Sequence, residues 1–132
     1  MQQVKVWVWV IIYKWDKVLL WKRINAHGEN TWSFPWWHLE YWESWSDCAH
    51  REVKEETWIE IDDLSHYHTT NDIFNKEQKH YITIFIQAKY KSWLIETLEP
   101  KKCKEWKWFN KTQLPENLFL PIKNLLKEKR NL

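Results

Sequence analysis

A run of alternating β-branched and bulky residues at 4–12, VKVWVWVII, most constrains how this chain can fold. Such alternation is typical of a β-strand that buries one face. Further strands are expected at 17–23, 59–61, 64–70, 80–90 and 105–109. Strands on both sides of one central helix, followed by a terminal helix, predict an α/β fold with a mixed β-sheet between α-helices.

Two segments carry the helical pattern. The first is expected over 45–57, where Ser44 precedes the helix as an N-cap and Asp47 stands three residues later. The second is expected over 119–129, where leucines recur on one side. The two helices supply apolar faces that can cover the two sides of the predicted sheet.

Length and charge narrow the class of protein. The 132 residues predict one domain over 1–132. A net charge of +2 argues against a protein that binds nucleic acid through bulk charge.

Cys48 and Cys103 lack the spacing of a zinc site and are expected to be reduced thiols. With no apolar run of about 20 residues, a cytoplasmic protein without membrane contact is expected.

Tryptophan stands where short loops ordinarily need glycine. The chain contains 13 tryptophans and one glycine, Gly28, although an average glycine content of about 7% predicts about nine. Trp15 falls in an expected turn, and Trp58 ends the first helix, where a glycine cap is commonest. We hypothesise that nine tryptophans replace glycines of a parent sequence. These are Trp7, Trp9, Trp15, Trp21, Trp36, Trp37, Trp42, Trp58 and Trp93.

Three glutamates, Glu52, Glu55 and Glu56, share one side of the first predicted helix. At about 100° per residue they fall within an arc of about 100° that borders the apolar stripe. Like charges at a partly buried edge repel one another, and a bound divalent cation would remove that repulsion. Hard oxygen ligands favour Mg²⁺ or Mn²⁺. A solvated acidic face, neutralised by neighbouring cations such as Arg51, explains the spacing equally well.

A longer motif surrounds these glutamates. From Trp37 to Ile59 the chain reads Trp-x5-Glu-x7-Arg-Glu-Val-Lys-Glu-Glu-Thr-Trp-Ile. This resembles the Nudix box, Gly-x5-Glu-x7-Arg-Glu-U-x-Glu-Glu-x-Gly-U, where U is a bulky aliphatic residue. Every element of the box other than glycine is present, and tryptophan holds both glycine positions. The segments KRINAH, HYITIFI and LEPKKCKEWKWF extend the resemblance over most of the chain.

The resemblance implies a Nudix fold and Mg²⁺-dependent hydrolysis, with Mn²⁺ as an alternative ion. The closest similarity is to small MutT-like nucleoside triphosphate diphosphatases, which release a nucleoside monophosphate and pyrophosphate and cleanse the nucleotide pool. It assigns catalysis and metal binding to Glu52, Glu55 and Glu56, and a further metal contact to Glu99, which otherwise reads as a plain loop glutamate. It gives structural roles in the motif to Trp37, Glu43, Arg51 and Trp58.

Substrate recognition is also implied by the resemblance. Arg23 matches a phosphate-contacting position, Thr83 shares a strand face that would line the base pocket, and Phe119 matches an aromatic residue that stacks on the base. Two of them have simpler interpretations: Arg23 as a solvated cation at a strand end, and Phe119 as a core residue that anchors the last helix. Phe119 stands where enzymes specific for oxidised guanine carry an amide, which favours a broader nucleotide preference.

Other functions compete with this interpretation. The hydrolase could act on another nucleoside diphosphate derivative such as ADP-ribose, or the fold could bind nucleotide without turnover. KEWKWFNK interleaves cations and aromatics, as single-stranded nucleic-acid binders do, but the small net charge disfavours a nucleic-acid partner. Small relatives often form homodimers, so a homodimer is a further expectation. Indoles at Trp36, Trp37 and Trp42 would crowd a phosphate-binding loop, so a damaged fold and weak or absent catalysis are expected.

Overall fold

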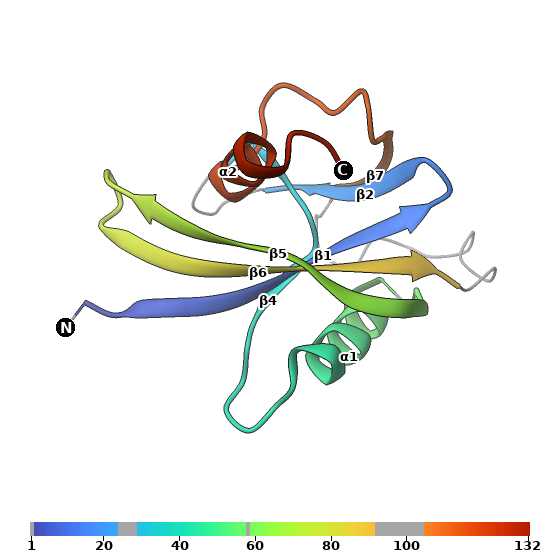
Figure 1. Ribbon diagram of the computed structural model, residues 1–132, viewed down its shortest axis with the longest axis horizontal. Coiled ribbons are helices and arrows are strands. Elements are labelled where there is room, and N and C mark those ends of the chain that lie inside the picture. The colour runs from blue at the N-terminus through green and yellow to red at the C-terminus, as the bar shows by residue number, and fades with distance from the viewer. Residues whose placement is uncertain (1, 24–28, 58, 92–104) are drawn as a thin grey trace.

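The computed structural model describes residues 2–23, 29–57, 59–91 and 105–132, and Figure 1 shows their arrangement. In chain order the elements are β1 (Val4–Lys14), β2 (Lys17–Lys22), β3 (Trp32–Ser33), β4 (Trp36–His38), α1 (Trp45–Thr57), β5 (Ile61–Phe74), β6 (Lys79–Tyr90), β7 (Glu105–Asn110) and α2 (Leu120–Lys129). None of the helices among these residues is long and apolar enough to cross a membrane.

One mixed sheet organises the fold. Its strand order is β3-β2-β1-β6-β5, with β4 added to β1 and β7 added to β2. β1 runs parallel to β6 from Val4 to Tyr13, whereas the other pairings are antiparallel. α1 and α2 lie on opposite sides of this sheet (Figure 1). The predicted α/β fold, with a mixed sheet between helices, is therefore confirmed.

β1 divides its side chains between two hydrophobic cores. Trp7, Trp9 and Ile11 point to the α2 side, where they pack with residues such as Phe119 and Leu125. Val8, Val10 and Ile12 point to the α1 side, together with Cys48, Ala49 and Val53 of the helix. Successive residues of a strand face opposite ways, so a strand that is apolar at every position must be covered on both sides.

Two predictions about the strands need correction. Residues 59 and 60 of the segment expected at 59–61 are not in a strand. Ile61 begins one long strand, β5, which also contains the segment expected at 64–70 and whose register shifts between Asp62 and Ser65 and again between His66 and His68. These irregularities break the alternation of side chains along the strand, which is why the sequence pattern appeared as two pieces. The pattern also gave no sign of β4, because three residues after Pro35 are too short a segment to show a period.

The described tryptophans of the glycine hypothesis fall into two groups according to the sign of their backbone φ angle. Trp15 has φ 57° and Trp42 has φ 70°, the left-handed conformation in which a side chain costs about 1–2 kcal/mol. The other described members of the glycine hypothesis lie in strands, and none of them has positive φ. These are Trp7, Trp9, Trp21, Trp36 and Trp37. Trp58 and Trp93 lie outside the described residues, as do Gly28 and Cys103.

Candidate active site

α1 begins where the sequence predicts it. Ser44 precedes the helix, and its Oγ accepts a hydrogen bond from the backbone N–H of Asp47 at 3.0 Å. This contact satisfies one of the free N–H groups of the first turn. The helix buries Cys48, whose free thiol faces the sheet, together with Ala49 and Val53. Of the charged residues between and beyond them, Arg51, Lys54 and Glu55 are exposed, whereas Glu52 and Glu56 are half-buried.

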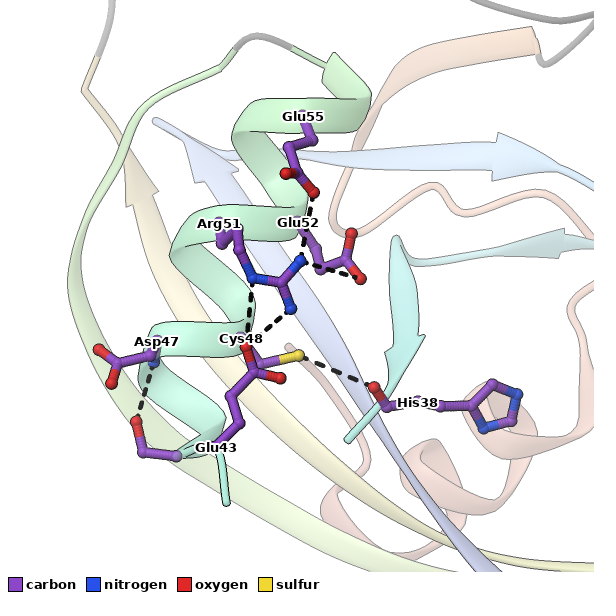
Figure 2. A network of polar contacts seen from close by, with 8 residues as sticks. His38, Glu43, Asp47, Cys48, Arg51, Glu52 and Glu55 are labelled. Carbon is purple, nitrogen blue, oxygen red and sulfur yellow. Dashed lines mark hydrogen bonds and ion pairs between the residues drawn. The ribbon is translucent and has the colours of Figure 1, made fainter. Parts of the chain in front are cut away.

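Arg51 is the centre of the polar network on this helix. Its Nη2 lies 2.7 Å from Glu43 Oε2, and its Nε also donates to that oxygen at 3.2 Å. Its Nη1 donates to Glu55 Oε1 at 3.2 Å and lies 3.7 Å from Glu52 Oε2. One guanidinium therefore ties the loop before α1 to two carboxylates farther along the helix, as Figure 2 shows.

The carboxylates of this network differ in their electrostatic setting. Burial raises the pKa of Glu52, and the neighbouring Glu55 and Glu56 raise it further, although Arg51 acts in the opposite direction. The hydrogen bond from Arg51 lowers the pKa of Glu43. The Glu52 side chain is 21% exposed, against 59% for Glu55. Glu43 is less exposed still, at 16%, but its pKa is lowered by Arg51, so Glu52 is the partly buried carboxylate whose pKa is raised.

The described residues do not by themselves form a closed metal-binding group. No set of three His, Cys, Asp or Glu side chains within the described ranges is close enough to hold a metal ion. Glu55 is turned toward Arg51 in this arrangement. Glu99, the predicted additional ligand, and Trp58, at the second glycine position of the motif, lie outside the described residues.

Trp37, at the first glycine position of the motif, is a buried residue of β4. It pairs with Val8 of β1, and its ring centroid lies 6.5 Å from that of Trp21 at an angle of 65°. The Trp37 side chain therefore packs in the α1-side core. The loop that carries Glu43 begins directly after this strand.

Arg23, a predicted phosphate contact, is buried although it is charged. It follows β2 and is only 7% exposed. Its guanidinium carbon lies 4.0 Å from the centre of the Phe119 ring and 5.2 Å from that of Trp36. Burial lowers the pKa of Arg23 to about 10. A cation held between aromatic rings in this way is stabilised by their quadrupoles rather than by water.

Thr83 and Phe119, the predicted base contacts, both lie in the α2-side core. Thr83 is fully buried, accepts a hydrogen bond from Trp7 Nε1 and donates one to Asp72. Phe119 immediately precedes α2 and stacks on Phe74 with ring centroids 5.3 Å apart. The three residues predicted to bind substrate therefore gather on the α2 side, whereas the glutamates lie on α1.

The sequence analysis missed the acidic residue of the α2 side. Asp72 is fully buried in β5 and accepts hydrogen bonds from Thr70, Thr83 and Asn124. A signal was present in the sequence, because Thr70, Asp72 and Phe74 share the buried face of an alternating strand. A carboxylate at such a position needs several donors, and that requirement points to a buried polar network.

Comparison with known proteins agrees with this fold. The family model of the NUDIX domain matches residues 1–129. The crystal structure of a MutT NUDIX hydrolase from Burkholderia pseudomallei superposes with a TM-score of 0.83 and 22% identity, over 96% of this chain and 98% of that one.

Two further solved structures share the fold. A NUDIX hydrolase from Nitrosomonas europaea has a TM-score of 0.68 and 22% identity, covering 82% of this chain and 73% of its own. A MutT/nudix family protein from Enterococcus faecalis has a TM-score of 0.65 and 25% identity over 83% of this chain. The match spans 45% of that longer protein.

Proposed function

This chain belongs to the NUDIX family, and we propose that it hydrolyses nucleoside triphosphates to a nucleoside monophosphate and pyrophosphate. The substrates would be ordinary or damaged nucleotides, so that the protein cleanses the nucleotide pool. We propose that the protein acts in the cytoplasm on small-molecule nucleotides and forms a homodimer. It rests on the motif carried by α1 and on the fold that presents this helix beside the sheet.

The observation that carries the proposal is the arrangement of carboxylates around Arg51. Glu43 and Arg51 fix the loop against the helix by a 2.7 Å ion pair. Glu52 lies on the same helix, with its pKa raised by burial and by adjacent carboxylates. A surface helix stabilised only by ion pairs has no need for such crowding. The arrangement suits a site that must attract positive charge.

The donor set fits a hard divalent cation, Mg²⁺ or Mn²⁺. Glu52, Glu55 and Glu56 of the motif would hold it, with Glu99, farther along the chain, as an additional ligand. When bound, such a cation supplies Lewis-acid stabilisation of the charge that develops on phosphate oxygens.

The side chains of this protein would contribute the remaining chemistry. Glu55 or Glu56 would accept the proton of the attacking water, a role that requires a carboxylate within hydrogen-bond reach of that water. Arg51 would orient Glu55 through the 3.2 Å hydrogen bond between them. On the opposite side of the sheet, Arg23 and Phe119 would supply a cation and a ring for the phosphates and the base, with Thr83 beside them.

A panel of substrates tests the proposal. Pyrophosphate release from each dNTP would be measured with and without Mg²⁺, together with monophosphate release from ADP-ribose. Turnover of dNTPs that depends on Mg²⁺ and disappears in Glu56→Gln supports the proposed reaction. Turnover of ADP-ribose alone would assign a different substrate. Salt-sensitive binding of an oligonucleotide without turnover of any nucleotide would overturn the assignment as an enzyme.

The same turnover assay tests the hypothesis that tryptophans replace glycines of a parent sequence. Trp36→Gly, Trp37→Gly and Trp58→Gly, singly and together, should increase turnover, because the family motif carries glycine at Trp37 and Trp58, and Trp36 adjoins the first of these positions. Equal turnover before and after the three replacements would show that these indoles do not hinder the reaction. Light scattering of the same samples would test the proposed dimer.

A further inference from the structure

We propose that an apolar patch on the α1 side of the sheet is the surface through which two copies of this chain form a dimer. The patch consists of Val4 and Val6 at the start of β1, Ile73 near the end of β5, and Tyr41 and Trp42 in the loop between β4 and α1. The inference deepens the homodimer of the proposed function and rests on that part of it alone, because dimer formation does not depend on the reaction.

The first argument is that the exposed apolar side chains gather in one place. Six large apolar side chains are exposed in the part of the chain that the structure describes, and five of them form this patch. Val4 pairs with His80 of β6, and His80 pairs with Ile73 of β5, so Val4 and Ile73 lie in one row across three strands. Val6 shares this face by alternation, but the core beneath α1 begins only at Val8. Figure 1 shows the start of β1 extending beyond α1.

The second argument is the size of the patch. Tyr41 and Trp42 are each 89% exposed, and side chains of this kind offer about 150–250 Å² each. The two rings and the partly exposed aliphatic side chains together reach the upper end of the range of about 300–600 Å² that is usual for the largest apolar patch of a monomer. A stable interface between two proteins buries about 800 Å² on each partner. The patch therefore has the size of the apolar centre of a dimer interface.

The third argument is the shape of the patch, which contains both a projection and a hollow. The rings of Tyr41 and Trp42 meet edge-on, with centroids 5.5 Å apart, and extend into solvent. Beside them lies an open hollow of about 670 Å³, whose apolar walls are Val6, Leu39 and the same two rings. Every contact of a two-fold dimer is made twice, so such a dimer needs a surface that fits its own copy. A surface with a projection next to a hollow meets this requirement.

The fourth argument is the distribution of charge along the patch. The loop 39–44 carries Glu40 and Glu43 and no cation, whereas residues 75–79, where β5 turns into β6, carry Lys76 and Lys79 against one acid, Glu77. A two-fold axis through the centre of the patch places the acidic end of one copy on the basic end of the other. An anionic lipid surface would instead repel the loop that carries the two exposed rings. The charges therefore favour a second copy as the occupant.

Analytical ultracentrifugation at rising protein concentration, without metal or nucleotide, measures the dimer directly. Trp42→Ala removes one ring from each copy and should weaken the dimer at least about tenfold, since tryptophan is among the residues that most often dominate an interface. The matched control is Trp15→Ala, because Trp15 is 87% exposed and also has positive φ but lies just beyond the far end of β1. Trp15→Ala should leave the dimer unchanged. Alanine keeps the Cβ atom in both variants, so the backbone strain at the two positions is not altered.

Charge reversal tests how the two copies are oriented. Glu40→Lys and Lys76→Glu should each weaken the dimer by about tenfold at low ionic strength, because each places like charges opposite one another. The double variant should return to within about threefold of the wild-type affinity, since the opposite ends then attract again. A dimer that neither reversal weakens, or a double variant no tighter than the single ones, would overturn the inference.

The remaining outcomes separate this inference from the proposed reaction. A wild-type dimer that survives Trp42→Ala would refute the interface and leave the homodimer standing. A wild-type chain that stays monomeric at every concentration would refute both, and its binding to phosphatidylcholine vesicles would assign the patch to a lipid surface instead. All substituted positions are exposed, and circular dichroism verifies that each variant folds. Turnover of dNTPs by the same samples decides the hydrolase independently of the dimer.

Discussion

The two sides of the sheet use their residues in different ways. On the α1 side, a few charged side chains lie near the surface and are linked through Arg51. On the α2 side, large rings fill the space, and a buried carboxylate, Asp72, connects them to the polar groups of β5 and β6. The α1 side can therefore lose a carboxylate and stay folded, whereas the α2 side depends on packing and on complete hydrogen bonding.

The largest expected effect is on catalysis at α1. Glu56→Gln should reduce dNTP turnover by about 10²–10⁴-fold, the range typical of a lost acid–base group, with little change in Tm. The matched control is Glu60→Gln, an exposed glutamate beyond the helix. Comparable losses from both variants would mean that α1 holds no special carboxylates and would remove the distinction between the two sides.

A smaller but substantial effect is expected in the stability of the α2 side. Asp72→Ala leaves two buried donors, Thr70 and Thr83, and the half-buried Asn124 without their acceptor, and should lower the free energy of unfolding by about 3 kcal/mol. Urea unfolding measures this change, and Asp62→Ala, at an exposed position of the same strand, is the control. If both variants lost the same stability, the network around Asp72 would contribute nothing beyond ordinary strand structure.

The left-handed turns should respond to removal of the Cβ atom. Trp15→Gly and Trp42→Gly should each raise the free energy of unfolding by about 1 kcal/mol, because glycine adopts positive φ without strain. Trp15→Ala separates this effect from loss of the indole, since alanine keeps a Cβ at the same φ. If Trp15→Ala raised the free energy of unfolding as much as Trp15→Gly does, the exposed indole and not the Cβ atom would be the destabilising group.

The smallest effect is expected from the charge on Glu52. Its pKa is raised in the folded state by burial, so folding favours the protonated form. The stabilisation is therefore present at low pH and is lost as the pH rises through the folded pKa. Without metal, Glu52→Gln should raise Tm at pH 7 by less than about 4 °C. At a pH below the folded pKa the wild-type and variant Tm values should converge, and a Tm at pH 7 that falls instead would contradict the sign.

The sequence predicted the parts of this structure that rest on local pattern. The helix from Trp45 to Thr57 follows from its N-cap and its apolar spacing, and the long strands follow from alternation. The resemblance gave Glu43 and Arg51 structural roles in the motif, and in the structure the two side chains form an ion pair. These features depend on neighbours within a turn or a strand, which a single sequence displays directly.

The contacts on the α2 side could not be predicted from the sequence alone. Asn124 and Asp72 are 52 residues apart, and Trp7 and Thr83 are 76 apart, so only the folded chain brings them together. Thr83 was predicted to line a base pocket, and the indole that packs against it comes from β1, at the other end of the sequence. Arg23 carries no pattern that distinguishes a buried cation from a solvated one.

The left-handed turn at Trp15 has a consequence for identifying relatives of this protein. Positive φ at Trp15 is a conformation that glycine adopts without strain, which is what the glycine hypothesis requires at this position. Under this hypothesis, positive φ would mark positions at which relatives carry glycine, even where the aligned residues differ. Peptide mass spectrometry of the protein from its own cells would read which residue is incorporated there.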